Sequence, residues 1–399
     1  MDASKRALFN AAYSDELFAA FLHRFKAKVG PIPFHVAETP LFMTEALRHR
    51  LARYSSEIVA QLARPPVLAD LRKAIPPRYD APGMDPLPNC VQVDFALVED
   101  GAGGIDGRLV ELQAFPSLYA LMKIQSDSWA ETFDRLPGLE GDWSWAMTPD
   151  EKQAIELMRR TIVADEDPRE VVLVDLEPEN QKTLPDFEAT RLLFGVESVC
   201  VSRLRKHGRE LFRERDGKLV RVRRIYNRMV FDELEIKRAS LPFRWTDELD
   251  VTWCSHPNWY WVWSKFSLPY LHHPAVPRTR LLSEVDDPGD LSTMVLKPLF
   301  SFAGSGVNVD VTPEDLARVP PEQREAWVLQ DKIRYADALH MPDGAGVKAE
   351  VRVMLLRPPE ADALVPLVCL VRLSRGKMLG VDYNKGLSWT GGTVGMWRR

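Results

Sequence analysis

The chain of 399 residues is too long for one hydrophobic core, and its 45% hydrophobic and 27% charged residues are typical of a folded α/β protein, not a disordered one. Its formal net charge of -5 provides no broad cationic surface, which argues against nucleic acid as the main partner. No apolar run approaches the roughly 20 residues that a bilayer requires, and the N-terminus has no apolar segment of signal-peptide length, so we expect a cytoplasmic protein without a membrane partner.

Residues 1–85 are predicted to form a helical N-terminal region. Apolar side chains recur there at helical spacing, for example at Leu17, Phe18 and Phe21. A series of prolines then interrupts the helical pattern before the first strand-like segment.

Residues 86–150 open on a predicted hairpin, in which an apolar strand at 91–98 and a second strand are joined by a glycine-rich turn. The first strand carries Asp94. Alternation along the second strand puts Glu111 and Gln113 on one face, where two oxygen atoms could reach one cation. Taken alone, these carboxylates are explained more simply as surface groups of a hairpin.

Residues 151–255 contain a strand at 171–174, a helix at 186–193 and a strand at 198–201. This order is a βαβ unit with a parallel pair of strands, and it predicts a small Rossmann-like domain. Near the end of the domain, Arg228 offers a bidentate guanidinium, and we select it as the ligand of a substrate carboxylate.

Residues 256–399 consist of short apolar strands bounded by glycine and proline, which suits a mostly antiparallel α+β lobe. One strand ends at Lys297 and is followed by small residues that include Gly304, Ser305 and Gly306. A lysine in this position can meet phosphate oxygens, and backbone amides of a small-residue flap can approach them closely. The segment is not a Walker loop, and a simple glycine turn explains it equally well.

Three further segments of this lobe carry polar groups at the ends of apolar strands. The linker formed by Gln330, Asp331, Lys332 and Ile333 could offer backbone groups to an adenine edge and a carboxylate to a ribose. Alternation puts Arg352 on one face of the next strand together with Glu350. The last segment adds Arg372, Asn384 and the diglycine 391–392, groups that suit the stabilisation of a transferring phosphoryl group.

In this order the segments resemble the nucleotide-binding lobe of ATP-grasp ligases. The resemblance implies that Lys297 and the loop from Gly304 through Ser305 to Gly306 contact phosphates, and that residues 330–333 hold the adenosine. It also implies a second phosphate-binding lysine earlier in the chain, which is Lys265. Arg352, Arg372 and Asn384 would face the triphosphate and the reacting carboxylate.

ATP-grasp proteins normally close this pattern with an acidic strand and a Glu-x-Asn that bind magnesium, whereas here the hairpin near the N-terminus supplies such groups. By the resemblance, Asp94, Glu111 and Gln113 are the metal ligands, with Gln113 standing where the family usually has Asn. This permuted order is similar to that of eukaryotic-type glutathione synthetases and glutathionylspermidine synthetases. The expected fold class is therefore α/β (α+β): a circularly permuted ATP-grasp fold with a Rossmann-like substrate domain at 151–255 and a helical N-terminal region.

The resemblance implies an ATP- and Mg²⁺-dependent ligase that forms a C–N bond between a small-molecule carboxylate and an amine through an acylphosphate. Two alternatives stay open: an ATP-grasp small-molecule kinase, and an ATP-binding protein without catalytic activity. The sequence does not identify the acid, the amine or the pathway. It also leaves the oligomeric state undetermined, and a homodimer is compatible with it.

Overall fold

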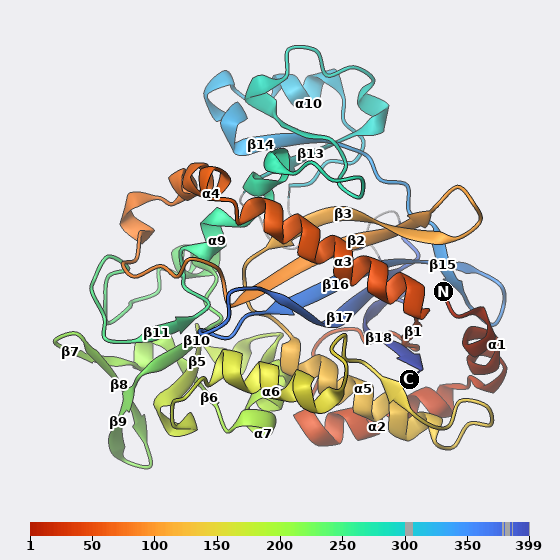
Figure 1. Ribbon diagram of the computed structural model, residues 1–399, viewed down its shortest axis with the longest axis horizontal. Coiled ribbons are helices and arrows are strands. Elements are labelled where there is room, and N and C mark those ends of the chain that lie inside the picture. Colours follow the sequence, from red (N-terminus) through yellow and green to blue (C-terminus); the bar gives the residue numbers. More distant parts are fainter. Residues whose placement is uncertain (300–305, 377–378, 380–383, 385, 399) are drawn as a thin grey trace.

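A computed structural model gives the arrangement of the chain (Figure 1), and the residues that it describes are 1–299, 306–376, 379, 384 and 386–398. The largest element is a mixed eight-stranded sheet in the order β1-β18-β17-β16-β2-β3, with β15 paired to β16 and β4 paired to β18. Its strands are β1 Leu41–Phe42, β2 Cys90–Glu99, β3 Ile105–Gln113, β4 Trp143–Ser144, β15 Asp337–His340, β16 Gly346–Leu356, β17 Val365–Ser374 and β18 Gly391–Arg398.

Strands from the two ends of the chain lie next to one another in this sheet. β2 pairs antiparallel with β16, and β1 pairs parallel with β18. The predicted hairpin consists of β2 and β3. It lies next to β16, so it extends a sheet whose other long strands, β16, β17 and β18, come from the C-terminal third of the chain (Figure 1). The diglycine 391–392 lies within β18, where a side chain at Gly391 would collide with the backbone oxygen of His35. Close packing of the N-terminal segment thus accounts for Gly391, one of the two glycines that the sequence analysis linked to a phosphoryl group.

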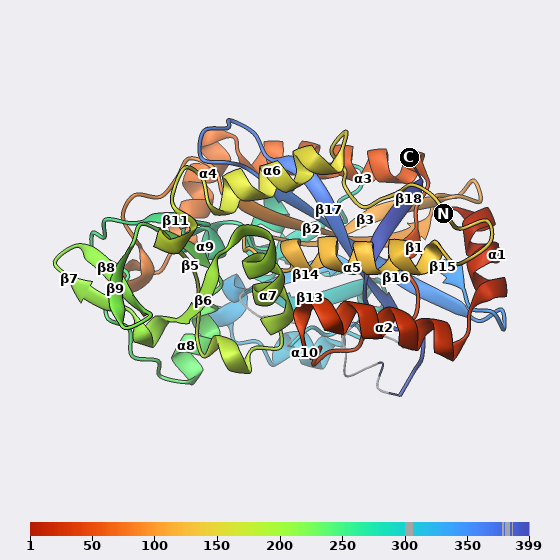
Figure 2. The same cartoon turned by 90° about the horizontal axis from the view of Figure 1, so that it is seen from below.

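Helices cover both faces of the large sheet, with α3 and α6 on one face and α5 and α2 on the other (Figure 2). Hydroxyl side chains cap two of them, Ser14 at α2 and Thr44 at α3, and each cap is followed by acidic residues that favour a helix N-terminus. The N-terminal helices share their core with the sheet. The helices are α1 Ala3–Ala12, α2 Asp15–Val29, α3 Glu45–Leu62, α4 Pro65–Leu71, α5 Tyr119–Phe133, α6 Glu151–Ile162, α7 Leu184–Phe194, α8 Phe231–Ile236, α9 Trp259–Val262 and α10 Pro313–Ala317.

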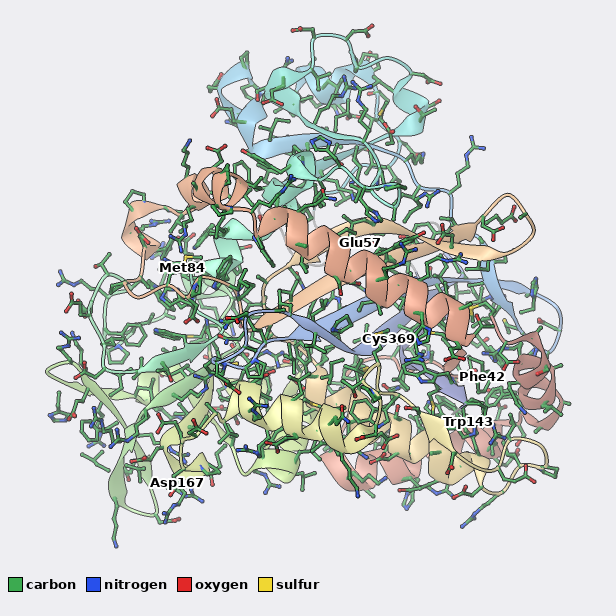
Figure 3. The ribbon with its side chains drawn as sticks, viewed as in Figure 1. Phe42, Glu57, Met84, Trp143, Asp167 and Cys369 are labelled. Atoms are coloured by element: carbon green, nitrogen blue, oxygen red, sulfur yellow. The ribbon has the colours of Figure 1, made fainter. Side chains whose placement is uncertain are left out.

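Aromatic side chains fill the core between the N-terminal helices and the sheet. Phe42 of β1 and Trp143 of β4 lie side by side in Figure 3, with ring centroids 5.2 Å apart. Phe21 of α2 stacks on Trp129 of α5 at 3.7 Å. These contacts tie the first 45 residues to β4 and α5 through apolar burial.

The predicted Rossmann-like unit is a parallel four-stranded sheet in the order β11-β10-β5-β6. The βαβ prediction is confirmed, because β5 and β6 are parallel and α7 connects them. The strands are β5 Val171–Asp175, β6 Glu197–Cys200, β10 Arg224–Asn227 and β11 Thr252–Cys254.

Two small antiparallel sheets complete the described part of the fold. One has the order β12-β14-β13 and its own apolar core, and it stands apart at the top of Figure 1. The other has the order β7-β8-β9 and projects from the Rossmann-like unit. Their strands are β7 Arg205–His207, β8 Glu210–Arg215, β9 Lys218–Val222, β12 Thr279–Leu281, β13 Met294–Pro298 and β14 Trp327–Asp331. Across the described ranges, no helix has both the length and the apolar character needed to cross a bilayer.

Candidate functional site

One face of the large sheet carries a row of charged side chains from three strands. Asp94 of β2 lies directly opposite Arg352 of β16 on one side and Glu111 of β3 on the other. On the next row, Glu350 lies opposite Arg372 of β17. Because opposite residues in an antiparallel pair share a face, the register alone brings these groups together.

Asp94 is the centre of this cluster and is 1% exposed. Arg352 donates to it through two nitrogens, Nε to Oδ1 at 2.6 Å and Nη2 to Oδ2 at 2.6 Å, and Arg372 also donates to Oδ2. Burial opposes ionisation of Asp94, but the two guanidinium groups outweigh it and hold the pKa of this carboxyl below its usual value. Arg372 further reaches Glu350 at 2.8 Å, and Tyr335 donates to the same carboxylate at 2.9 Å.

These bonds bear on the predicted metal site. Asp94 Oδ2 accepts from two arginines and Oδ1 accepts from one, so little of this carboxylate is left for a cation. In the part of the chain that the structure describes, no cluster of three or more His, Cys, Asp or Glu side chains is arranged to hold a metal ion. Glu111 and Gln113 line one pocket together and remain as an oxygen pair. Such a pair fits Mg²⁺ that also keeps phosphate oxygens or water as ligands, but it does not form a complete protein cage.

The amide of Gln113 is held by a neighbour that the sequence reading did not select. Gln92 lies opposite Gln113, and its Oε1 accepts from Gln113 Nε2 at 2.7 Å and from Arg352 Nη1 at 2.7 Å. The Nε2 of Gln92 donates to the backbone oxygen of Ser117. Gln92 stands two residues before Asp94 on the same strand face, which is the signal that could have identified it.

Two lysines of the C-terminal third meet strand β3. Lys297 donates to the backbone oxygen of Val110 at 3.1 Å and to Gln330 Oε1 at 2.6 Å. Burial lowers the pKa of Lys297 to about 8, with Lys265 adding repulsion and Glu111 opposing both effects. Lys265 Nζ lies 3.7 Å from Glu111 Oε2. The two lysines that the sequence assigned to phosphate are thus brought to the strand that carries Glu111.

The linker predicted to hold adenosine is engaged in sheet contacts. Gln330 accepts from Lys297 and donates to Thr279 Oγ1, so both ends of its side chain are used. The amides of Asp331 and Lys332 donate to backbone oxygens of neighbouring segments, and Lys332 pairs with an acidic residue at 3.6 Å. Adenosine binding by this linker, including Ile333, stays a prediction.

The residues assigned to the flap and to the last loop are covered only in part. Gly304 and Ser305 lie outside the described residues. Gly306 is described, and its φ of 73° is a conformation that favours glycine. Asn384 Oδ1 accepts from Ser374 Oγ and from the backbone amides of residues 375 and 376, each at 3.0 Å. The carbonyl end of this amide therefore binds the end of β17 and the two residues that follow it, and the role of Asn384 at the triphosphate stays a prediction.

The guanidinium of Arg228 is held by groups within the chain, and its role at a substrate carboxylate stays a prediction. It is 3% exposed, and its Nη1 donates to Asp186 at 2.5 Å while Nη2 lies 3.3 Å from Ser117 Oγ. Asp186 also accepts from the backbone amides of Leu118 and Leu121. Arg228 thus joins the Rossmann-like unit to the segment that follows the hairpin, because a carboxylate within the chain already takes its fork.

A pocket lies between the end of β3 and the tryptophan-rich segment that leads to Lys265. Its enclosed volume is about 30 Å³, which is room for a water molecule but not for a nucleotide. The side chains and backbone that line it are Glu111, Leu112, Gln113, Ala114, Phe115, Tyr260, Trp263, Ser264, Lys265 and Leu299.

Comparisons with known proteins give a likeness of fold only. No protein-family model and no curated protein matches the chain. A solved structure does match: a glutathione synthetase-like effector from Globodera pallida in its apo form, with a TM-score of 0.55 and 13% sequence identity. The match covers 91% of this chain and 96% of that one. The chain therefore has an α+β fold similar, over nearly its whole length, to that of a glutathione synthetase-like protein.

Proposed function

We propose that this protein is an ATP- and Mg²⁺-dependent ligase of the circularly permuted ATP-grasp type, which joins a carboxylate to an amine through an acylphosphate. One observation carries the proposal: Lys265 and Lys297, from the C-terminal third, contact strand β3 at Glu111 and at Val110. Glu111 lies in the first third of the chain, so the split set of phosphate and metal ligands becomes one site. The likeness to a glutathione synthetase-like structure supports the fold part of the proposal.

Each side chain of this site has a role that follows from its contacts. Bound ATP would supply the phosphoryl group that activates the carboxylate. Lys297, fixed by Gln330, and Lys265 would neutralise phosphate oxygens, since both ammonium groups lie beside β3. Glu111 and Gln113 would hold the magnesium that a nucleotide carries. Asp94 would hold Arg352 in place.

The small volume of the pocket has a consequence for binding. A nucleotide cannot enter a space of about 30 Å³, so we expect the sheet β12-β14-β13 to move away from β3 when ATP binds. The bonds from Lys297 to Val110 and from Lys265 to Glu111 would then be exchanged for bonds to phosphate.

Release of ADP tests the proposed reaction. The full chain is incubated with Mg²⁺, ATP and pooled carboxylates with pooled amines, and then with each pool alone. We expect release that requires both pools, a hydroxamate when hydroxylamine replaces the amines, and loss of both signals in Glu111→Ala. Glu99→Ala, at the exposed end of β2, is the matched control and should retain activity. Full activity in Glu111→Ala would contradict the proposal, and a stable phosphorylated product without an amine requirement would assign a kinase instead.

A second candidate, an ATP-binding protein without catalysis, is favoured by one observation. Arginine occupies most of the acceptor positions of Asp94, and Arg352 also lies 3.9 Å from Glu111, so the carboxylates of the predicted metal set are already engaged within the chain. Saturable binding of Mg²⁺-ATP without turnover on any acceptor would support this candidate.

A further inference from the structure

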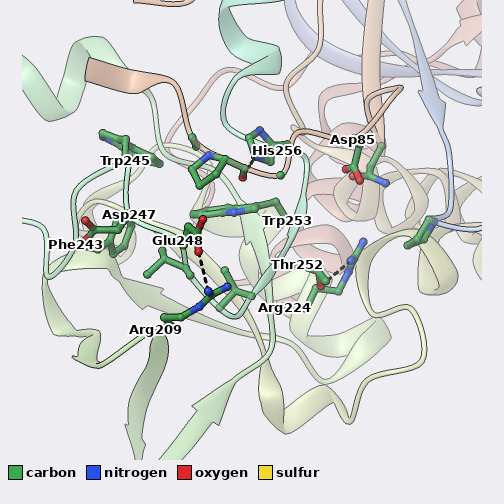
Figure 4. Close-up of a pocket in the computed structure, with 17 residues that line it drawn as sticks. Asp85, Arg209, Arg224, Phe243, Trp245, Asp247, Glu248, Thr252, Trp253 and His256 are labelled. Atoms are coloured by element: carbon green, nitrogen blue, oxygen red, sulfur yellow. Dashed lines mark hydrogen bonds and ion pairs between the residues drawn. The ribbon is translucent and has the colours of Figure 1, made fainter. Parts of the chain in front are cut away.

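A second and larger pocket lies at the amino-terminal ends of β10 and β11, where Arg224 and Thr252 are register partners (Figure 4). It encloses about 380 Å³, a size found for small-molecule sites. Over the described ranges it shares no lining residue with the pocket at Glu111. It is therefore a separate candidate site, and the proposed ligase chemistry does not use it.

Aromatic rings form one wall of this pocket. Trp253 packs against Trp245 with ring centroids 6.2 Å apart and against Phe243 at 6.4 Å, and Figure 4 shows these rings on the side away from Asp85. His256 also lines the wall, and burial lowers its pKa to about 4, so its ring is neutral near pH 7. The wall thus provides apolar rings, and the charged groups beside it are paired, Arg209 with Glu248 and Asp247 with Lys206.

Opposite charges line the other end of the pocket without forming an ion pair. Arg224 is 2% exposed and donates to the backbone oxygens of Thr161 and Ile162 and to Thr252 Oγ1. Asp85 is half-buried and has no hydrogen bond or ion pair among the residues that the structure describes. A guanidinium group has five N–H donors, so its three bonds do not exhaust Arg224.

A buried acceptor without a donor lies at the same end. Asn89 is 1% exposed, and its Nδ2 donates to the backbone oxygen of Arg357 at 3.1 Å, while its Oδ1 has no partner. Leaving such an oxygen unpaired is unfavourable, and a ligand with N–H donors would satisfy it. The guanidinium of Arg357 also lies near Asp85 and bonds to backbone oxygens such as that of Leu87.

We propose that this pocket binds a free α-amino acid with an aromatic side chain. Its ammonium group is received by Asp85 and by Asn89 Oδ1, its carboxylate by Arg224, and its ring by the wall at Trp253. An α-amino acid fits because it places a donor and an anion side by side, which matches acceptors and a guanidinium group that do not pair with each other. A simple amine lacks the group for Arg224, and a simple acid brings a second negative charge to Asp85.

Calorimetric titration of the full chain with L-phenylalanine, L-tyrosine and L-tryptophan tests this inference. We expect saturable binding of at least one of them. Its decarboxylated amine and its deaminated acid should each bind roughly tenfold more weakly or less, since each loses a charge-assisted contact. No saturable binding of the three amino acids would overturn the inference, and so would equal binding of the amine or of the acid.

Variants of the pocket give an independent measurement. Asp85→Asn and Trp253→Ala should each weaken amino-acid binding by roughly tenfold or more. Asp142→Asn, an exposed aspartate outside the pocket, is the matched control and should bind as the wild type does. Unchanged affinity in Asp85→Asn would overturn the inference. Because the comparison of ligand analogues uses the wild-type chain, it decides the question even if a variant fails to fold.

Discussion

Asp94 connects β2 to two strands of the C-terminal third through its side chain. Its carboxylate accepts from Arg352 of β16 and from Arg372 of β17, and Asp94 and Arg352 are buried, whereas 32% of the Arg372 side chain is exposed. Burying charges of this kind is unfavourable unless every one is paired. The residue that the sequence assigned to magnesium is therefore, in this structure, the partner on which two arginines of the site depend.

Replacing Asp94 tests this dependence. Asp94→Asn leaves the buried Arg352 and the partly exposed Arg372 short of one negative charge, and we expect the free energy of unfolding to fall by roughly 3 kcal/mol. The measurement is equilibrium unfolding in urea. Glu99→Gln removes a carboxylate from the exposed end of the same strand and should change stability by less than about 0.5 kcal/mol. Equal stability of the two variants would show that the arginines do not need Asp94.

Lys297 makes a prediction about pH. Burial lowers its pKa from the ordinary 10.5 to about 8. Between pH 8 and pH 10.5 the unfolded chain keeps a proton on this lysine that the folded protein has released. The free energy of unfolding therefore rises with pH across this range. Below about pH 8 the burial of the charged lysine destabilises the folded protein in full. Relative to the wild type, Lys297→Met should therefore be more stable at pH 7 than at pH 10, as measured in urea. Lys182→Met, at an exposed lysine, is the matched control, and a Lys297→Met difference that does not change with pH would contradict the prediction.

At the scale of elements, one helix is capped by a residue of another. The N-cap position of α5 is Leu118, with φ 64° and no side-chain cap of its own. Asp186 of α7 takes its place and accepts from the amides of Leu118 and Leu121 at 3.0 and 3.1 Å while it holds Arg228. This single carboxylate thus fixes the start of α5 and joins it to the Rossmann-like unit.

Loss of this cap should loosen α5. Asp186→Asn removes the charge between two helical amides and a buried guanidinium, and we expect a loss on the order of 3 kcal/mol in the free energy of unfolding. Hydrogen exchange should show faster exchange in the first turn of α5. Glu188→Gln, on the partly exposed side of α7, should have little effect on exchange in α5. Unchanged exchange in α5 would mean that the cap is not needed.

Elements with a strong local pattern were predictable, and elements held by distant pairing were not. The unit formed by β5, α7 and β6 follows from a buried apolar strand, a helix and a glycine at 195. β1 is two residues long and has no pattern of its own, because its pairing with β18 alone defines it. The sheet β7-β8-β9 was missed since charged residues obscure the alternation in its strands.

The same limit applies to the candidate site. The resemblance to ATP-grasp ligases drew attention to Asp94, Glu111 and the two lysines. It could not show that Asp94 pairs with Arg352, a partner 258 residues away, because register across a sheet fixes that contact. The contact between Arg228 and Asp186 was not predictable for a related reason, since the two residues are 42 positions apart and Asp186 lies on a helix.

At the scale of the whole molecule, we propose that residues from the first and last thirds of the chain form one nucleotide-binding site. Strand β2 beside β16, and Lys297 beside β3, are the contacts on which this claim depends. The order of the segments along the chain matters less than their position in the folded sheet.

Calorimetric titration with ATP in the presence and absence of Mg²⁺ tests this claim most directly, because it needs no knowledge of the acid or the amine. We expect saturable, Mg²⁺-dependent binding to the wild type. Glu111→Gln, near the start of the chain, and Lys297→Met, near its end, should each weaken that binding by roughly tenfold or more. Absence of saturable binding, or full affinity in Glu111→Gln, would contradict the claim.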